Sequence, residues 1–235
     1  ACVVMEPMNL AAPRPGFLAE VAELTRANGA VLVFDETITG FRYANGGAQE
    51  YFGVTPDLAT FGKGLANGYP LSAVTGRADI MKCMEEVFFS FTFGGETLSL
   101  AAAVATMDKL RREPVVATIA RQGEKILAGV RGLIATSGCG EFLAVSGHPS
   151  WSFLTLSDAG ACTSWELKTL LEQELFARGV LAYGTHNLCY AHGDAEVTRL
   201  LGTYAEVFPI LRQAAEQGAT GLLRCPPLRP LFRVR

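Results

Sequence analysis

The chain has 235 residues, of which 49% are hydrophobic and 18% charged, and this composition excludes intrinsic disorder. Its 20 basic and 23 acidic residues give a net charge of −3 without a dense Lys/Arg cluster, which argues against a nucleic-acid or anionic-membrane partner. No apolar run approaches the roughly 20 residues that span a bilayer. The composition is typical of a folded, soluble, cytoplasmic protein with a large core.

The first third of the sequence alternates short apolar runs with amphipathic stretches, which predicts strand–helix–strand units and a mainly parallel sheet. We expect strands at 1–5, 30–34, 58–61 and 71–75, and helices at 17–28 and 78–86. A glycine-rich segment separates the last two strands. The chain starts without a methionine and enters an apolar strand at once, so we expect it to be the C-terminal portion of a longer protein.

The rest of the sequence has an α+β pattern. We expect helices at 96–112, 115–135, 164–178 and 194–216, strands at 142–145, 152–156 and 180–183, and an extended tail at 222–235. Pro114 marks the break between the first two helices. The pattern therefore predicts an α/β domain over residues 1–111, followed by a smaller α+β domain over residues 112–235.

Cysteine and histidine are too scattered for a metal site. The six cysteines stand singly, and the three histidines fall on different segments, so no zinc-type spacing occurs. We expect no metal, and we interpret the cysteines as free thiols because nothing else indicates secretion.

Asp35 is the first residue that indicates chemistry. It follows a run of five apolar residues and is expected at the carboxyl end of a central strand, where open α/β sheets bind ligands. A carboxylate in that place needs a cation or a hydrogen-bond donor. A helix cap or a structural ion pair is the alternative interpretation.

Lys63 is the second such residue, because it stands between two glycines directly after an apolar strand. Flanking glycines let a bulky ligand approach the backbone, and a lysine in an apolar pocket can attack an aldehyde. A surface turn with an exposed lysine is the alternative, and the P-loop pattern GxxxxGK[ST] is absent. Together, a strand-end carboxylate and a glycine-flanked lysine match the needs of pyridoxal phosphate.

Three segments, in the same order along the chain, resemble class III aminotransferases, which are fold-type I pyridoxal-phosphate enzymes. They are residues 34–42 (FDETITGFR), 51–58 (YFGVTPDL) and 62–64 (GKG), with further similarity at 91–95 (FTFGG) and 191–192 (AH). Within that family the chain is most similar to the branch of glutamate-1-semialdehyde aminomutase. The resemblance implies that residues 1–111 are the C-terminal part of the cofactor-binding large domain of a PLP-transferase fold, and that residues 112–235 are its small domain.

The resemblance also implies roles for individual residues. Lys63 matches the Schiff-base lysine that moves the substrate proton, and Asp35 matches the aspartate paired with the pyridine nitrogen. Thr92 matches a threonine that binds the cofactor phosphate from the neighbouring subunit, which implies a homodimer with shared active sites. Glu6 matches a glutamate that in some members pairs with a substrate-gating arginine, or it is a strand-end carboxylate without a catalytic part. His186 either lines the substrate site or is a structural histidine.

Three departures from the family pattern affect these expectations. Glu96 and Thr97 replace an Asn-Pro pair, and the side chain of either residue can accept hydrogen bonds from the exposed N–H groups of the following helix. Residues 184–188 (GTHNL) stand where the aminomutase has an acidic residue, which favours a transaminase with another substrate. The family's N-terminal half, which supplies a phosphate-binding turn and the aromatic residue stacked on the ring, is not part of this sequence.

These observations predict a pyridoxal-phosphate-dependent aminotransferase. It would move an amino group from a small-molecule donor amine to a carbonyl acceptor through Lys63. Two alternatives remain: an intramolecular 2,1-aminomutase that uses the same groups, and a non-catalytic fragment that lacks the N-terminal half of the site.

Overall fold

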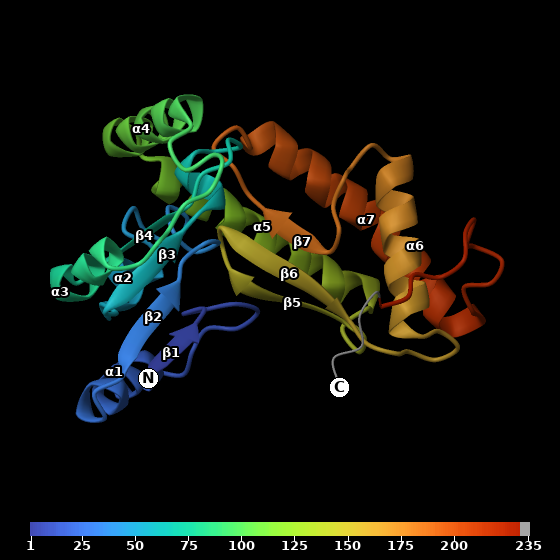
Figure 1. The fold of residues 1–235 in the computed structure, drawn as a ribbon. Helices are drawn as coiled ribbons and strands as arrows, with labels where there is room; N and C mark the ends of the chain where they lie inside the picture. Colours follow the sequence, from blue (N-terminus) through green and yellow to red (C-terminus); the bar gives the residue numbers. More distant parts are fainter. Residues whose placement is uncertain (231–235) are drawn as a thin grey trace. The chain divides into compact units, whose positions relative to one another are not determined.

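The computed structural model describes residues 1–230 and confirms the predicted mixed α/β fold (Figure 1). The chain divides into two compact units, residues 1–118 and 119–235. Each has its own sheet. Within residues 1–230, every helix is too short or too polar to cross a membrane.

The first unit contains a four-stranded sheet in the order β1-β2-β3-β4. The strands are β1 (Cys2–Met5), β2 (Val31–Asp35), β3 (Leu58–Phe61) and β4 (Ala73–Gly76). Strands β1, β2 and β3 are parallel, whereas β4 runs antiparallel to β3. The predicted mainly parallel sheet is therefore correct, and the carboxyl ends of β1, β2 and β3 share one edge.

Helix α1 (Phe17–Ala27) covers one face of this sheet. Its Leu18 is buried against Leu32 and Phe34 of β2, and the three form a small core with an exposed fraction of 3% or less. Side chains alternate between the faces of a strand, so Asp35 lies on the opposite face from Phe34. The apolar run thus anchors β2 through α1 while its last residue faces away from that helix.

A short helix that the sequence did not predict, α2 (Ala48–Phe52), depends on a distant carboxylate. Glu36 is almost fully buried, and its side chain accepts hydrogen bonds from the backbone N–H groups of Ala48 (2.7 Å) and Gln49 (2.8 Å). Gly47 precedes the helix with φ +85°, and a Cβ there would lie 2.5 Å from the Glu36 carboxylate. Only glycine fits this turn, because it must leave room for the capping oxygen.

The sequence predicted one helix at 78–86. The structure has a short α-helix there, α3 (Ala78–Met81), which continues as the 3-10 turn η2 (Lys82–Glu85). Helix α4 (Thr97–Arg112) follows. The Glu96 carboxylate accepts hydrogen bonds from the N–H groups of Leu98 (2.7 Å) and Ser99 (2.8 Å). Glu96 therefore caps α4, as expected for a carboxylate at a helix N-terminus.

The second unit packs three helices against a small antiparallel sheet in the order β5-β6-β7 (Figure 1). It contains all but the first turn of α5 (Val115–Ser137), followed by β5 (Leu143–His148), β6 (Trp151–Leu156), α6 (Ser164–Ala177), β7 (Thr185–Asn187) and α7 (Asp194–Gln217). One continuous core joins them, with leucines of α6 and the aromatic residues Tyr204 and Phe208 of α7 fully buried. The predicted helices of this region are confirmed.

The strand predicted at 180–183 is wrong, because β7 instead begins at Thr185. Gly179 and Gly184 both have φ +73°, so the chain turns before and after the apolar stretch. Within it Val180 packs against the core, whereas Leu181 is 77% exposed. Alternating burial arises here without strand pairing, and pairing with β6 starts only at Gly184, whose carbonyl accepts from the Leu154 N–H at 2.8 Å.

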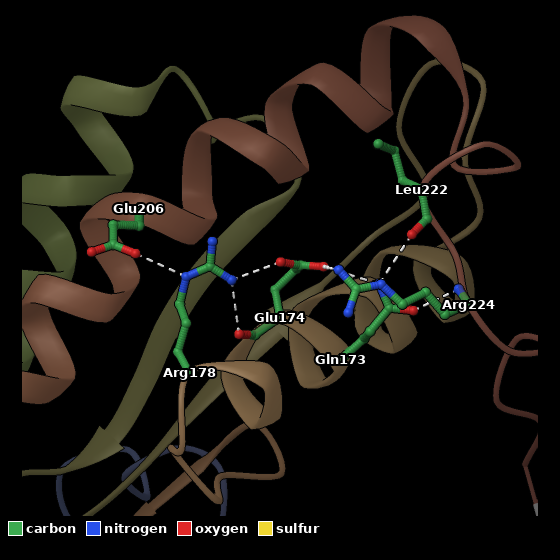
Figure 2. A network of polar contacts seen from close by, with 6 residues as sticks. All are labelled: Gln173, Glu174, Arg178, Glu206, Leu222 and Arg224. Atoms are coloured by element: carbon green, nitrogen blue, oxygen red, sulfur yellow. Dashed lines mark hydrogen bonds and ion pairs between the residues drawn. The ribbon is translucent and has the colours of Figure 1, made fainter.

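Polar side chains of α6 form hydrogen bonds with the segment that follows α7 (Figure 2). The Gln173 amide donates to the carbonyl of Leu222 at 3.0 Å and accepts from the Arg224 N–H at 2.6 Å. The buried Glu174 carboxylate pairs with Arg178 at 2.6 Å, and Arg178 reaches Glu206 of α7 at 2.9 Å. Residues 226–230 have no regular secondary structure, and residues 231–235 of the predicted extended tail lie outside the described residues.

Two glycines of α5 give a matched test of this packing. A Cβ at Gly123 would lie 1.7 Å from the carbonyl oxygen of Pro149, so Gly123→Ala must push α5 away from the turn between β5 and β6. We expect Gly123→Ala to lower the free energy of unfolding by about 1–3 kcal/mol or more, as overpacking does. Thermal or urea unfolding monitored by circular dichroism measures the change.

Gly132→Ala is the control, because a Cβ at Gly132 meets no atom within 4 Å. In an open helical position alanine is favoured over glycine, so this variant should be more stable by roughly 0.5–1 kcal/mol. Equal effects of the two substitutions would show that α5 does not approach the β5–β6 turn as described.

Candidate active site

Asp35 lies at the end of β2, and both hydrogen bonds to its side chain use the same oxygen. Its Oδ1 accepts from the Thr37 backbone N–H at 2.9 Å and from the Thr60 hydroxyl at 3.1 Å. Within residues 1–230, no hydrogen bond of ordinary geometry reaches Oδ2, although the Thr37 side chain also lies close enough to lower the Asp35 pKa. One carboxylate oxygen is thus held by the protein, and the other is available to a ligand.

The surroundings of Asp35 favour its ionised form. The Thr37 side chain has the largest effect and lowers the Asp35 pKa below its ordinary value of 3.8. Burial opposes this effect, whereas the Thr37 N–H, the Thr60 hydroxyl and the positive charge of Lys63 lower the pKa further. Asp35 is therefore a carboxylate throughout the neutral pH range. Such a group can accept a charge-assisted hydrogen bond from a protonated ring nitrogen.

Lys63 opens the 3-10 turn η1 (Lys63–Leu65), directly beyond the end of β3. Its φ of +41° lies in the left-handed region, which side-chain-bearing residues rarely adopt. Such a conformation costs on the order of 1–3 kcal/mol and persists only where the surroundings impose it. The side chain is exposed, so its amine is accessible to a ligand.

The residues that follow Lys63 fix this turn. Leu65 and Ala66 are buried against Ala103 of α4, and the Leu65 N–H donates to the Gly62 carbonyl at 2.9 Å. Gly40 completes the packing, since a Cβ there would lie 2.6 Å from the Phe61 ring. The glycine of the segment 34–42 thus allows the loop after β2 to lie close to the end of β3.

The structure brings Asp35 and Lys63 together at one edge of the sheet. Their strands are neighbours, with Asp35 in register with Thr60, three residues before Lys63. The positive charge of Lys63 makes a small contribution to lowering the Asp35 pKa. An anionic and a cationic group therefore face the same edge, where parallel sheets bind ligands.

Glu6 follows β1 at the same edge of the sheet. Met5 pairs with Phe34, so Glu6 comes next to Asp35 in register. Its Oε2 accepts from the Asn9 amide at 3.0 Å, and it lines a groove of about 380 Å³ with Asn9 and Arg14. Within residues 1–230, no arginine pairs with Glu6, and Arg14 instead pairs with Glu20. The expected pairing with a gating arginine stays a prediction.

Thr92 stands in an exposed turn at residues 92–95, just before the cap of α4. Among the described residues, its hydroxyl has no hydrogen bond to Asp35 or Lys63. The structure of a single chain therefore does not bring Thr92 together with the other two predicted cofactor residues, and its role stays a prediction.

His186 lies in β7 of the second unit, where both ring nitrogens have partners. Its Nδ1 lies 2.8 Å from the Ser152 hydroxyl and its Nε2 lies 2.8 Å from the Tyr204 hydroxyl. Burial lowers the pKa of His186 to about 4, so the ring is neutral at pH 7. His186 also lines a cavity of about 400 Å³. These contacts favour the structural interpretation, whereas the substrate-site role stays a prediction.

Two residues around Asp35 were not singled out from the sequence, namely Thr37 and Thr60. Both lie within the segments that carry the other site residues, but the sequence does not show which side chains meet. The register of β2 against β3 decides that Thr60 reaches Asp35. The sequence signal that could have indicated Thr60 is its position three residues before the glycine-flanked Lys63.

The donor set suits an aldehyde-bearing, pyridine-type cofactor better than a metal ion. Lys63 offers an amine for the aldehyde, and the free Oδ2 of Asp35 offers an acceptor for a ring N–H. The region described by the structure contains no group of three His, Cys, Asp or Glu side chains arranged to hold a metal ion.

Comparison with known sequences identifies a family whose match includes both Asp35 and Lys63. Residues 1–143 match the family described as aminotransferase class-III. The chain is 35% identical over 188 residues to 3-aminobutyryl-CoA aminotransferase of Cloacimonas acidaminovorans, covering 79% of this chain and 45% of that protein. It is 32% identical over 228 residues to glutamate-1-semialdehyde 2,1-aminomutase of Methanosarcina acetivorans, covering 88% and 52%. The chain thus spans about half the length of these curated relatives.

Solved structures share the fold. An omega-transaminase from Sphaerobacter thermophilus superposes with a TM-score of 0.79 at 26% identity, covering 90% of this chain and 52% of that one. The FumI protein of Sphingopyxis sp. MTA144, in its PLP internal aldimine form, gives a TM-score of 0.82 at 24% identity, covering 94% and 55%. With the family match over more than half of its residues, the chain belongs to the class III aminotransferases.

Proposed function

We propose that the whole protein is a pyridoxal-phosphate-dependent aminotransferase that moves an amino group from a small-molecule donor amine to a carbonyl acceptor. The observation that carries this proposal is the position of Asp35 and Lys63 at the carboxyl ends of two neighbouring parallel strands. The left-handed backbone of Lys63 supports it, because strained residues cluster at functional sites.

Each residue has one task in this proposal. Bound pyridoxal phosphate supplies an aldehyde and an electron-accepting ring. The Lys63 amine binds the cofactor aldehyde and, once released by the donor amine, moves the proton at the substrate α-carbon. The free Oδ2 of Asp35 holds the ring nitrogen protonated, which requires the carboxylate to be ionised. Residues 1–111 form the cofactor-binding part, and residues 112–235 form the small domain.

An intramolecular 2,1-aminomutase is the second candidate function. It is favoured by relatives named glutamate-1-semialdehyde 2,1-aminomutase, one of them 44% identical over 139 residues in Alkaliphilus oremlandii. The same lysine and aspartate serve both reactions. Amino transfer to an added keto acid would support the transaminase, whereas isomerisation of a single substrate without an added acceptor would support the aminomutase.

We also propose that the active protein is a homodimer in which Thr92 binds the cofactor phosphate of the partner subunit. The turn that carries Thr92 follows a strongly exposed aromatic stretch. Phe88 is 94% exposed, Phe89 66% and Phe93 69%. Contiguous exposed apolar side chains of this kind indicate a protein–protein interface. An association that covers them would bring the Thr92 hydroxyl and the nearby glycine N–H groups to a second copy.

The first test is removal of the Lys63 amine in the whole protein. We expect Lys63→Ala to abolish amino transfer to an added keto acid and the absorbance band of the bound cofactor, with an unchanged circular dichroism spectrum. Lys63→Arg should fail as well, because a guanidinium stays protonated and does not attack the aldehyde.

Lys82→Ala is the control for Lys63, since Lys82 is an exposed lysine of the same unit outside the sheet edge. It should retain both the band and the activity. Normal amino transfer by Lys63→Ala would refute the assignment of Lys63.

The second test neutralises Asp35. Asp35→Asn keeps the shape of the side chain but removes the charge that holds the ring nitrogen protonated. Loss of this charge-assisted hydrogen bond should raise the barrier by about 2–4 kcal/mol, which lowers kcat roughly 30- to 1000-fold. Steady-state kinetics with saturating cofactor measure the effect.

Asp79→Asn serves as the matched control, because Asp79 is an exposed carboxylate of the same unit. Its kcat should stay within a factor of two or three. If Asp35→Asn also stayed within a factor of three, Asp35 would have only a structural role.

The third test concerns the shared site. Thr92→Ala should weaken binding of pyridoxal phosphate and leave the dimer intact, whereas Thr92→Ser, which keeps the hydroxyl, should bind nearly as the parent does. Titration of the cofactor, with light scattering for the mass, measures both properties. An unchanged affinity in Thr92→Ala, or a monomer that binds the cofactor tightly, would contradict the proposal.

A further inference from the structure

The two oxygens of the Asp35 carboxylate are in different situations. Oδ1 accepts from the Thr37 N–H at 2.9 Å and from the Thr60 hydroxyl at 3.1 Å, whereas within residues 1–230 no hydrogen bond of ordinary geometry reaches Oδ2. The Thr37 side chain also acts on the carboxylate and lowers its pKa. A carboxylate with one oxygen held at two points cannot rotate freely about its terminal bond. Its free oxygen is therefore aimed by its partners and not by the Asp35 side chain alone.

Of the two partners, Thr60 is the one that links the neighbouring strand to Asp35. The parallel register pairs Asp35 with Thr60, so the two side chains lie on the same face of the sheet. Thr60 is β-branched, which leaves its hydroxyl few orientations. Strand β3 ends at Phe61, and Lys63 follows immediately. One short stretch of chain thus carries both the lysine and the donor to the aspartate.

We propose that Thr60 is a positioning residue, whose hydroxyl holds the Asp35 carboxylate so that Oδ2 faces the protonated ring nitrogen of the cofactor. This inference rests on the proposed function, because it assigns the second partner of the same aspartate. It gives Thr60 no contact with the substrate. Thr60 acts through Asp35: its hydroxyl orients the carboxylate and, together with Thr37, favours the ionised form.

The charges around Asp35 agree with this role. The positive charge of Lys63, in the turn after β3, lowers the Asp35 pKa. The negatively charged Glu6 follows β1 at the same edge of the sheet. Thr37 and Thr60 are neutral donors that stabilise the ionised form. Loss of the Thr60 hydroxyl leaves the charges in place but removes one donor, so Asp35 should take up a proton at a higher pH.

The test compares Thr60→Val, which keeps the branched shape but lacks the donor, with Thr60→Ser, which keeps the donor. The whole protein is labelled with carbon-13 at the aspartate carboxyl carbons and titrated by NMR without cofactor. The Asp35 signal is identified by its absence in Asp35→Asn. We expect the Asp35 pKa to rise in Thr60→Val and to return toward the parent value in Thr60→Ser.

A second measurement uses pyridoxal phosphate itself. Its affinity should fall about three- to tenfold in Thr60→Val, which corresponds to loss of part of one charge-assisted hydrogen bond, and recover in Thr60→Ser. Circular dichroism melting shows whether both variants keep the fold.

The outcomes separate this inference from the proposed function. An unchanged Asp35 pKa in Thr60→Val would overturn the role of Thr60, and so would an equal rise in both variants, which would indicate loosened strand pairing. A parent protein that fails to bind pyridoxal phosphate while its Asp35 pKa still responds to Thr60→Val would support the contact and overturn the proposed function.

Discussion

The parallel pairing of β2 with β3 is the constraint on which the candidate active site depends. It sets Asp35 opposite Thr60 and brings the end of β2 next to the chain that carries Lys63. A shift of one residue would turn Asp35 toward α1 and place Phe34 at the site, because side chains alternate between the faces of a strand. The core formed by Leu18, Leu32 and Phe34 excludes that shift, since it would have to bury a carboxylate in their place.

The backbone of Lys63 needs a second source of stabilisation, because its left-handed conformation costs on the order of 1–3 kcal/mol. Burial of a leucine side chain contributes roughly 1.5–3 kcal/mol, and Leu65 lies two residues later in the core beneath the turn. The two magnitudes are similar. The packing of Leu65 and Ala66 against α4 therefore offsets strain of the size expected at Lys63.

The sequence predicted the parts of this site that depend on local pattern. The apolar runs before Asp35 and before Lys63 gave the strands and their ends, and most helices followed from periodicity and proline breaks. Features that depend on contacts between distant residues were missed. Helix α2 is held by Glu36, the Asp35–Thr60 hydrogen bond depends on strand register, and the apolar stretch 180–183 lies between two turns instead of pairing. The cap by Glu36 and the strand register depend on residues far apart in the sequence, whereas Gly179 and Gly184 were a local signal for the turns around 180–183.

The assignment of Lys63 is tested most directly by locating the bound cofactor chemically. The whole protein is incubated with pyridoxal phosphate, reduced with borohydride, digested and examined by peptide mass spectrometry. A single phosphopyridoxyl group on the peptide that contains Lys63, lost in Lys63→Ala, is the expected result. Modification spread over several surface lysines, or one specific site elsewhere with Lys63 unmodified, would contradict the cofactor site described at the ends of β2 and β3.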